Sequence, residues 1–417
     1  MENLIEEISK KSKSAFQIIS TSSIQKRNSA ILNISKLLKQ YTHKILDANK
    51  LDLDNAVKKK LASSFIDRLT LNEVRIKNMC DGLEEISTLA DPIGKKIESW
   101  DRPNGLKIEK VSVPLGIIGI IYESRPNVTI DAGSLCIKSG NVSILRGGSD
   151  SFHSSKLLAN LMQEGLEQSN LPKNVVQFVE TTDRAMVTQM LQASKYIDVI
   201  IPRGGKSLVE KIQQEARVPV FAHLEGICHV YIDHEANMEI ALNVLLNSKL
   251  RRTGVCGAAE TLLIDKRLDE NQVFNIISQL VSKGCEVRAE KAIKNKFNNI
   301  SIATEKDWYT EYLDSIISVK YVNDVENAIE HINKYSSDHT ETIITENKRT
   351  AEKFLNHVDS AIVMHNASTQ FADGGEFGMG AEIGISTGRL HARGPVGSEQ
   401  LTSFKYIVRG NGQTRKI

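Results

Sequence analysis

The sequence lacks the features that mark exported, membrane-spanning or nucleic-acid-binding proteins. No apolar run is long enough for a bilayer-crossing helix, and residues 1–16 mix acids and bases without an apolar signal core. The formal net charge is only +2, so no basic excess points to nucleic acid. These absences predict a cytoplasmic protein that has neither a membrane nor a nucleic acid as its partner.

Cysteine is scarce and unpaired. The five cysteines form no CxxC pair, and no histidine cluster has the spacing of a zinc site. They are Cys80, Cys136, Cys228, Cys256 and Cys285. An odd, scattered set is typical of free thiols in a reducing compartment, so neither disulfides nor a bound metal are expected.

Glycine is absent before Gly82, and the first 95 residues or so have a helical pattern. One apolar stripe, preceded by cap candidates at Ser20 to Ser23, recurs at spacings of three and four. Its members are Ile24, Arg27, Ile31, Ile34, Leu38 and Tyr41. With 417 residues, the chain is long enough for two or three domains.

Beyond about residue 99 the pattern changes to strands that alternate with helices. Asn104-Gly105 is a turn signal, and the alternation over 107–113 predicts a hairpin with one solvent-facing side. The apolar runs that follow are 116–122, 142–145, 175–179, 197–201, 229–232, 261–264 and 342–345, with helices near 151–168, 235–251 and 268–283 and a last strand at 401–408. Such βαβ alternation predicts an α/β fold with parallel, doubly wound sheets in two blocks.

Three strand ends carry residues suited to a phosphate-bearing ligand. They are Arg146-Gly147-Gly148, Arg203-Gly204-Gly205 and the loop 123–127. Ligands of parallel sheets bind at the carboxyl ends of strands, and arginine offers paired donors to a phosphate, including the 2′-phosphate of NADP. A single Arg-Gly-Gly is more simply interpreted as a tight turn. Two of them after consecutive strands make a ligand-binding site as good an interpretation as a turn. The spacing is not the GxGxxG fingerprint.

Cys256 is the candidate nucleophile. It lies between a predicted helix and a predicted strand, with Gly254 and Gly257 beside it and Arg251 and Arg252 nearby, and nearby cations favour the thiolate. The simpler alternative is a buried structural cysteine, which we assign to the other four. Cys228 is next to His229, but adjacent side chains on a strand point to opposite faces.

A glycine-rich stretch follows at 371–384, with five glycines in the eleven positions from Gly374. So many flexible positions favour a loop that wraps a ligand over a linker. After it comes His391-Ala392-Arg393-Gly394-Pro395, for which a surface turn is the alternative.

These motifs together resemble the γ-glutamyl phosphate reductases of the aldehyde dehydrogenase superfamily, over nearly the whole chain. The most specific are 122–129, 201–205, 226–233, 311–314, 366–378 and 390–397. The resemblance implies NADPH-dependent reduction of L-glutamyl 5-phosphate to L-glutamate 5-semialdehyde, the second step of proline synthesis, through a thioester on Cys256. It also implies an NADP-binding domain (1–98 and 114–222), a catalytic domain (223–395) and an oligomerisation hairpin and strand (99–113 and 396–417).

Roles for single residues follow from the same resemblance. The Cys256 N–H and Asn127 would stabilise the oxyanion. The residues implied to bind the cofactor are Arg146, Gly147, Gly148, Pro202, Arg203, Gly204, Gly205 and Glu311. Arg125 and Arg393 would pair the substrate carboxylate, although salt bridges or subunit contacts are equally good roles for them. A homo-oligomer is implied, and the lability of the acyl phosphate makes a complex with the upstream glutamate 5-kinase attractive.

Two departures from the superfamily pattern stand out. His223 occupies the position of the glutamate that activates water in hydrolytic members, with Glu225 displaced by two, which fits an enzyme whose thioester exchanges with phosphate. Gly257 replaces an asparagine after the cysteine, and the stretch 250–253 is altered. The alternatives are another acylating aldehyde dehydrogenase, for example a CoA-dependent one, and a catalytically silent nucleotide-binding protein that keeps the fold.

Overall fold

The computed structural model describes residues 4–415, and the chain divides into two compact units. The first unit comprises Met1–Ala222, Gly378–Gly384 and Val396–Ile417, and the second comprises His223–Phe377 and Ile385–Pro395. The second unit is therefore inserted in the chain of the first. The hairpin and the last strand, which the sequence analysis set apart, are grouped here with the first unit.

The amino-terminal segment is helical, as the glycine-free sequence predicts. Its helices are α1 (Leu4–Ile19), α2 (Ile24–Gln40), α3 (Thr42–Lys58), α4 (Ser63–Leu69) and α5 (Glu73–Thr88). The Ser23 side chain caps α2 by accepting from the Lys26 N–H at 3.4 Å. Arg27 lies on the buried stripe of α2, where its guanidinium pairs with Asp91 at 2.8 Å and binds the Lys138 carbonyl at 2.5 Å. The stripe therefore contains a paired cation.

The sheet of the first unit has four parallel strands in the order β5-β4-β3-β6. The strands are β3 (Ile117–Tyr122), β4 (Val142–Gly147), β5 (Val176–Phe178) and β6 (Val199–Arg203), and the helices between and after them are α6 (Asn127–Lys138), η1 (Ser149–Ser151), α7 (Phe152–Glu167), η2 (Lys173–Val175), α8 (Ala185–Gln192) and α9 (Lys206–Glu215). Tyr122 of β3 is in register with both Gly147 and Arg203. The strand ends that the sequence singled out therefore lie side by side at one edge of this sheet.

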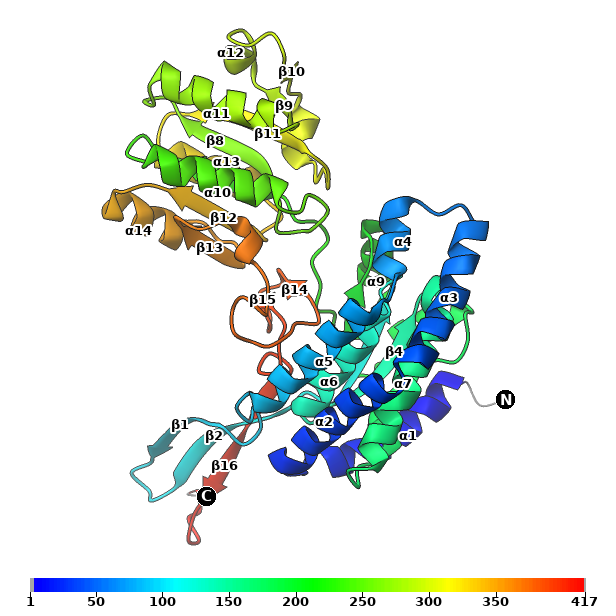
Figure 1. Ribbon diagram of the computed structural model, residues 1–417. Coiled ribbons are helices and arrows are strands. Elements are labelled where there is room, and N and C mark those ends of the chain that lie inside the picture. The colour runs from blue at the N-terminus through cyan, green and yellow to red at the C-terminus, as the bar shows by residue number, and fades with distance from the viewer. Residues whose placement is uncertain (1–3, 416–417) are drawn as a thin grey trace. The chain divides into compact units, whose positions relative to one another are not determined.

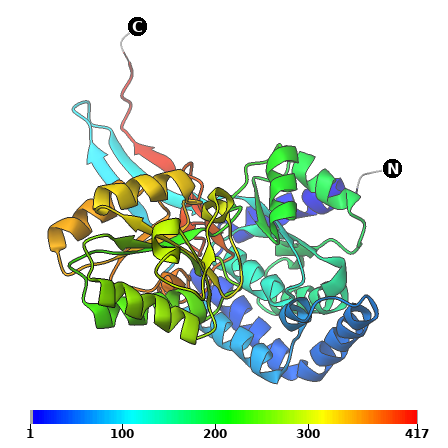
Figure 2. The same cartoon turned by 90° about the horizontal axis from the view of Figure 1, so that it is seen from above.

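A separate antiparallel sheet is built from the predicted hairpin and the last strand. β1 (Lys96–Asp101) and β2 (Lys107–Pro114) are joined by the Asn-Gly turn, in which Gly105 has φ +85°. β16 (Thr402–Arg409) pairs with β2, and Figure 2 shows the cyan and red strands side by side. The chain closes this sheet with residues almost 300 positions apart, such as Lys110 and Tyr406.

The second unit is a seven-stranded parallel sheet in the order β10-β9-β11-β8-β7-β12-β13. Its strands are β7 (Cys228–Ile232), β8 (Ala259–Asp265), β9 (Glu286–Ala289), β10 (Ser301–Ile302), β11 (Ile316–Val322), β12 (Thr340–Ile344) and β13 (Ile362–His365). The remaining elements are α10 (Met238–Leu250), α11 (Glu270–Ser282), α12 (Lys291–Lys294), η3 (Glu305–Tyr309), α13 (Val325–Tyr335), α14 (Lys348–His357), η4 (Thr369–Phe371), β14 (Ile385–Ser386) and β15 (Gly394–Pro395).

Helices cover both faces of this sheet, and each face has its own apolar cluster (Figure 1). Leu245 of α10 and Ile276 of α11 pack in one cluster, whereas Ile329 of α13 and Phe354 of α14 pack in the other. Because strand side chains alternate, neighbouring residues such as Val230 and Tyr231 serve opposite clusters. No helix among residues 4–415 is both long and apolar enough to cross a membrane.

Candidate functional site

Cys256 lies in the turn that leads from the end of α10 to the start of β8. Its side chain is half-buried. The Cys228 thiol donates to the Cys256 carbonyl at 3.1 Å. A Cβ built on Gly226 would lie 2.1 Å from that same carbonyl oxygen. The loop that carries Cys256 therefore packs directly on a bare backbone, and glycine is required at 226.

Two histidines meet at the Cys256 thiol. One nitrogen each of His223 and His339 lies within 4.8 Å of the Cys256 sulfur and of the other histidine. His223 Nδ1 donates to the Ile385 carbonyl at 2.6 Å, which leaves its Nε2 as the nitrogen with a lone pair when the ring is neutral. His339 Nδ1 lies 2.9 Å from the Thr340 hydroxyl.

These histidines decide the protonation of Cys256. Burial alone would raise the pKa of the thiol, but the charge of a protonated His339 and hydrogen bonds from His223 and His339 outweigh burial and hold the pKa well below its ordinary value. For Cys228 nothing opposes burial, so its pKa is raised well above the ordinary range. The pKa values of the two neighbouring thiols are thus shifted in opposite directions, and Cys256 is the one that favours the thiolate.

The segment around Cys256 is anchored from the stretch 368–370. The Gln370 amide donates to the carbonyls of Ser248 at 2.9 Å and Arg252 at 3.0 Å, and the Ser248 hydroxyl lies 3.1 Å from that of Ser368. A Cβ on Gly257 would lie 3.0 Å from the Thr369 carbonyl. Glycine in place of asparagine at 257 thus matches a close approach of two backbones.

Glu311 is tied to the loop that supports Cys256. Its carboxylate accepts from the Gly226 N–H at 2.9 Å, and burial raises its pKa. Two residues on, the Leu313 N–H donates to Glu260 at 3.3 Å, and Glu260 pairs with Lys249 at 2.6 Å. Lys249 and Glu260 are both fully buried. This ion pair therefore holds the segment that carries Glu311.

The residues predicted to bind a cofactor lie at the strand ends of the first unit, with differences in detail. Arg146 is buried, and its guanidinium donates to the carbonyls of Gly147, Thr182 and Asp183. Its hydrogen bonds thus hold the loops at this edge. Gly147 faces the Tyr122 ring, whose nearest atom would lie 3.2 Å from a Cβ built there.

Helix N-termini at this edge already have carboxylates from the chain itself. Asp52 of α3 accepts from the His153 and Ser154 N–H groups at the start of α7, at 3.1 and 2.8 Å. Glu123 accepts from the Gly205 N–H at the start of α9 at 2.9 Å. The positive end of a helix attracts an anion, and here a side chain supplies it.

Chain order reverses between β3 and β6, which is the switch point at which open parallel sheets bind ligands. Gly204 and Gly205 are exposed there, after Pro202. The Nε of Arg203 is buried and has no hydrogen-bond partner in the described part of the chain. Donors and bare backbone at this point fit a phosphate-bearing ligand.

Asn127 is the first residue of α6, and its amide donates to Asp131 at 2.9 Å. Burial raises the pKa of Asp131 to about 6, against the lowering effects of the Asn127 hydrogen bond and the Arg203 charge. An amide has two N–H donors, so one remains for other use.

The two arginines predicted to bind substrate lie in different units. Arg125 is half-buried in the turn between β3 and α6 of the first unit. Arg393, in the second unit, donates to the carboxylate and the carbonyl of Asp359, each at 2.6 Å. A salt bridge, one of the alternatives drawn from the sequence, is thus what the structure shows for Arg393.

The glycine-rich stretch is ordered by Asp373, whose carboxylate accepts from the Gly375 N–H at 2.8 Å.

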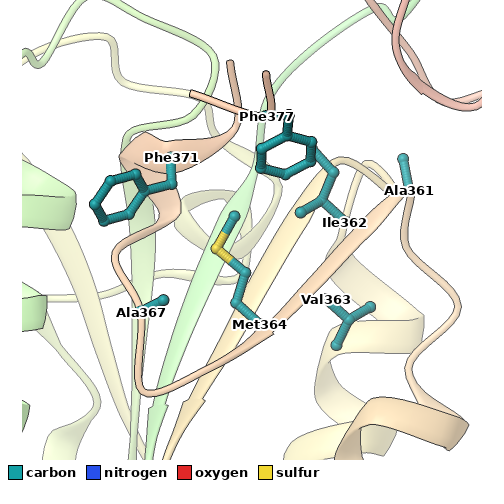
Figure 3. Close-up of a pocket in the computed structure, with 7 residues that line it drawn as sticks. All are labelled: Ala361, Ile362, Val363, Met364, Ala367, Phe371 and Phe377. Atoms are coloured by element: carbon teal, nitrogen blue, oxygen red, sulfur yellow. The ribbon is translucent and has the colours of Figure 1, made fainter. Parts of the chain in front are cut away.

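A shallow apolar hollow lies elsewhere on the second unit, on strand β13 (Figure 3). In Figure 3 the Met364 side chain extends from the strand toward the Phe371 and Phe377 rings. The hollow has a volume of about 440 Å³, and its lining residues are Ala361, Ile362, Val363, Met364, Ala367, Phe371 and Phe377. With no polar side chain in its lining, the hollow offers surface for packing and no group for chemistry.

Sequence reasoning missed His339 and underrated His223. His223 was noted only as the replacement for a water-activating glutamate, and His339 gave no signal because it lies 83 positions from Cys256 in a short loop before β12. Only the parallel pairing of β7 with both β8 and β12 brings the three residues together.

Comparison with known proteins identifies the family of the chain. The sequence model of the "Aldehyde dehydrogenase family" matches residues 2–297. Among curated proteins, gamma-glutamyl phosphate reductase of Parvibaculum lavamentivorans is 56% identical over 99% of this chain and 97% of its own, and that of Brucella suis is 55% identical over 98% and 97%. The crystal structure of gamma-glutamyl phosphate reductase from Thermotoga maritima superposes with a TM-score of 0.97 at 43% identity, covering 99% of this chain and 100% of that one. The chain therefore belongs to the aldehyde dehydrogenase family, and within it to the gamma-glutamyl phosphate reductases.

Proposed function

We propose that the protein reduces L-glutamyl 5-phosphate to L-glutamate 5-semialdehyde with release of phosphate, using NADPH, as the second step of proline synthesis from glutamate. The observation that carries the proposal is the Cys256 thiol between His223 and His339, with its pKa well below the ordinary value. A thiolate is the form that attacks an acyl group.

The Cys256 thiolate would attack the acyl carbon, so that the S–C bond forms, the bond from carbon to the phosphate oxygen breaks, and phosphate leaves. NADPH, when bound, supplies the hydride that reduces the resulting thioester. The oxyanion that remains collapses to the aldehyde and returns the electron pair to the Cys256 sulfur. The two histidines stabilise that leaving thiolate in the last step as they do in the free enzyme.

The oxyanions of both steps need donors that are already in place. The Cys256 N–H and the Asn127 amide are our candidates. Asp131 accepts a hydrogen bond from one N–H of the Asn127 amide, and this bond orients the second N–H of the amide.

An Asn127→Asp variant replaces the donor by an acceptor at nearly constant volume, so it should lower kcat far more than it raises KM.

Enzymes of the aldehyde dehydrogenase family use nicotinamide cofactors. NADP(H) is our candidate, held at the strand ends of the first unit by Gly147, Gly148 and Gly204 with Arg203, whose buried Nε is unsatisfied. Arg146 would act by holding the loop, because its guanidinium is used by backbone carbonyls. Pro202 and Gly205 belong to the same turn, and Glu311 would accept from the nicotinamide ribose.

The thioester must survive until reduction, and the residues around it suit this. The position of the water-activating glutamate is taken by His223, whose Nδ1 is used by the Ile385 carbonyl. The ring of His223 also hydrogen-bonds the Cys256 thiol, so this histidine is engaged on both sides and is a poor base for water.

Two arginines are candidates for binding the α-carboxylate of the substrate. Arg125, in the turn between β3 and α6, is our candidate for this carboxylate. Arg393 is engaged with Asp359. Arg125→Met should raise KM for glutamyl phosphate and leave KM for NADPH unchanged.

We further propose a homo-oligomer. β13 is the outer strand of its sheet, with the apolar hollow of Figure 3 beside it. The three-stranded sheet also exposes Phe404, Tyr406 and Val408. Apolar surface of this kind is typical of subunit contacts.

The decisive experiment is the reverse reaction with Cys256→Ser as its control. The wild-type protein should reduce NADP with glutamate 5-semialdehyde only when phosphate is present, and the variant should lose this activity while still binding NADPH. Activity with CoA in place of phosphate would favour the CoA-dependent alternative, which the named relatives do not favour. No activity under either condition would favour a silent binding protein, and unchanged turnover of the variant would end the covalent proposal.

A further inference from the structure

We propose that Cys256, His223 and His339 also form a binding site for a thiophilic divalent transition-metal ion such as Zn²⁺, and that the bound ion blocks the nucleophile. One atom from each of the three residues lies within 4.8 Å of the other two. Thiolate and imidazole are the ligands that zinc prefers, whereas calcium and magnesium require oxygen.

The spacing needs only a small contraction. With Zn–S near 2.3 Å and Zn–N near 2.05 Å, ligand atoms of a tetrahedral site lie roughly 3.3–3.6 Å apart. The ligand atoms of the three residues are at most 4.8 Å apart, so each pair must approach by up to about 1.2–1.5 Å. Rotation of the side chains can supply this movement. Three protein ligands leave a fourth position for water or an anion, as in open zinc sites.

Both histidines are oriented as metal ligands usually are. His223 donates from Nδ1 to the Ile385 carbonyl, and such a hydrogen bond on the far nitrogen fixes the ring and makes the near nitrogen a better ligand. His339 has its Nδ1 beside the Thr340 hydroxyl, and its Nε2 is buried with no nitrogen or oxygen partner in the part of the chain that the structure describes. When the ring is neutral with its proton on Nδ1, this Nε2 has a lone pair to offer a metal ion.

The charges around the three residues also suit a cation. Glu311 interacts electrostatically with Cys256 and with His223, and it is itself mostly buried. A thiolate and a nearby carboxylate together balance the two charges of a zinc ion, so the ion can enter without leaving a buried charge uncompensated.

Binding is tested first with the metal alone, on the full-length, metal-free protein. Zn²⁺ competed against a chromophoric chelator should bind at one ion per chain, and Co²⁺ should give the sulfur-to-cobalt absorption and the intense visible bands of a tetrahedral thiolate site. Cys256→Ser should abolish the sulfur band and weaken zinc binding at least 100-fold. Cys285→Ser removes a buried thiol that has no part in the site and is the matched control.

A second group of ligand atoms must be excluded by the same titration. Asp233, His234 and Glu235 also place ligand atoms within 4.8 Å of one another. If His234→Ala abolishes the stoichiometric ion and Cys256→Ser does not, the proposal is overturned.

A second measurement uses the wild-type chain and so does not depend on a variant that folds. Saturating Zn²⁺ should slow alkylation of Cys256 by iodoacetamide at least tenfold, and a chelator should restore the rate. An unchanged rate would overturn the proposal. The inhibitory consequence rests on the proposed function, but binding does not, so zinc bound at Cys256 in a protein without reductase activity would contradict only the function.

Discussion

Replacing Lys249 by methionine should give a second unit whose stability falls as pH rises, through the buried Glu260. Lys249 and Glu260 are fully buried and lie 2.6 Å apart, and burial raises the pKa of Glu260 to about 7 even beside the lysine. Without the lysine, the buried carboxylate has no counter-ion and must take up a proton for the chain to stay folded.

The size of the effect follows from the free energy needed to protonate Glu260. Relative to the ordinary glutamate pKa of 4.5, protonation at pH 7 costs about 3.4 kcal/mol and at pH 5.5 about 1.4 kcal/mol, at about 1.36 kcal/mol per pH unit. The folded-state pKa of Glu260 is raised, so the variant folds best at low pH and loses stability as pH rises. The double variant Lys249→Met with Glu260→Gln carries no buried charge, so the single variant should lose about 2 kcal/mol relative to it between pH 5.5 and pH 7.

The chain offers a specific probe for this measurement. It contains two tryptophans, of which Trp308 is buried in the second unit and Trp100 lies on β1. In a Trp100→Phe background, urea unfolding followed by fluorescence therefore reports on the second unit. Removing the exposed pair Lys296–Glu270, which lies in the same unit as Trp308, is the matched control and should leave the stability of the second unit nearly unchanged at both pH values. A stability difference between Lys249→Met and the double variant that is the same at pH 5.5 and pH 7 would refute the reasoning.

Three further predictions concern the loop of Cys256 and an unrelated helix. Gly226→Ala should lower kcat at least tenfold and slow alkylation of Cys256, because its Cβ would lie 2.1 Å from the Cys256 carbonyl; retained kcat would show that the loop adapts freely. Gly82→Ala should instead raise Tm, by a stabilisation of about 0.5–1 kcal/mol, because Gly82 lies within α5 with nothing within 4 Å of the added Cβ; a lower Tm would contradict this. Alkylation of wild-type Cys256 should change little with pH near neutrality because its pKa is well below the ordinary value, whereas in His339→Ala the rate should rise about tenfold per pH unit; a steep rise in the wild type would count against the thiolate.

The sequence predicted those elements whose pattern is long or strongly marked. Apolar runs such as 116–122 became buried strands, and the Asn-Gly turn at 104–105 formed the expected hairpin. β9 and β11 were missed because Lys, Arg and Glu interrupt their apolar pattern, as in Glu286–Ala289 and at Lys320. Their order in the sheet comes from pairing between distant segments, which no local pattern encodes.

The candidate site shows the same division. Cys256 was found from its glycine-flanked turn and from the family motifs around it. His339 was not, because the distance from Cys256 to His339 depends on three strands in register, and a single histidine has no periodicity. Arg146 was given a ligand role from its neighbours in sequence, and only the fold shows that its hydrogen bonds go to backbone carbonyls.

The pairing of β2 with β16 has a consequence for the order in which the molecule is made. β1 and β2 leave the ribosome early, but their third strand is Thr402–Arg409, almost 300 positions further along the chain. A lone two-stranded hairpin is marginally stable in water, so this part of the first unit cannot be completed until that strand has been synthesised. Meanwhile the whole second unit, inserted between the two, has time to fold. A chain truncated before Thr402 should therefore contain a finished second unit and a hairpin that exchanges its amide protons freely.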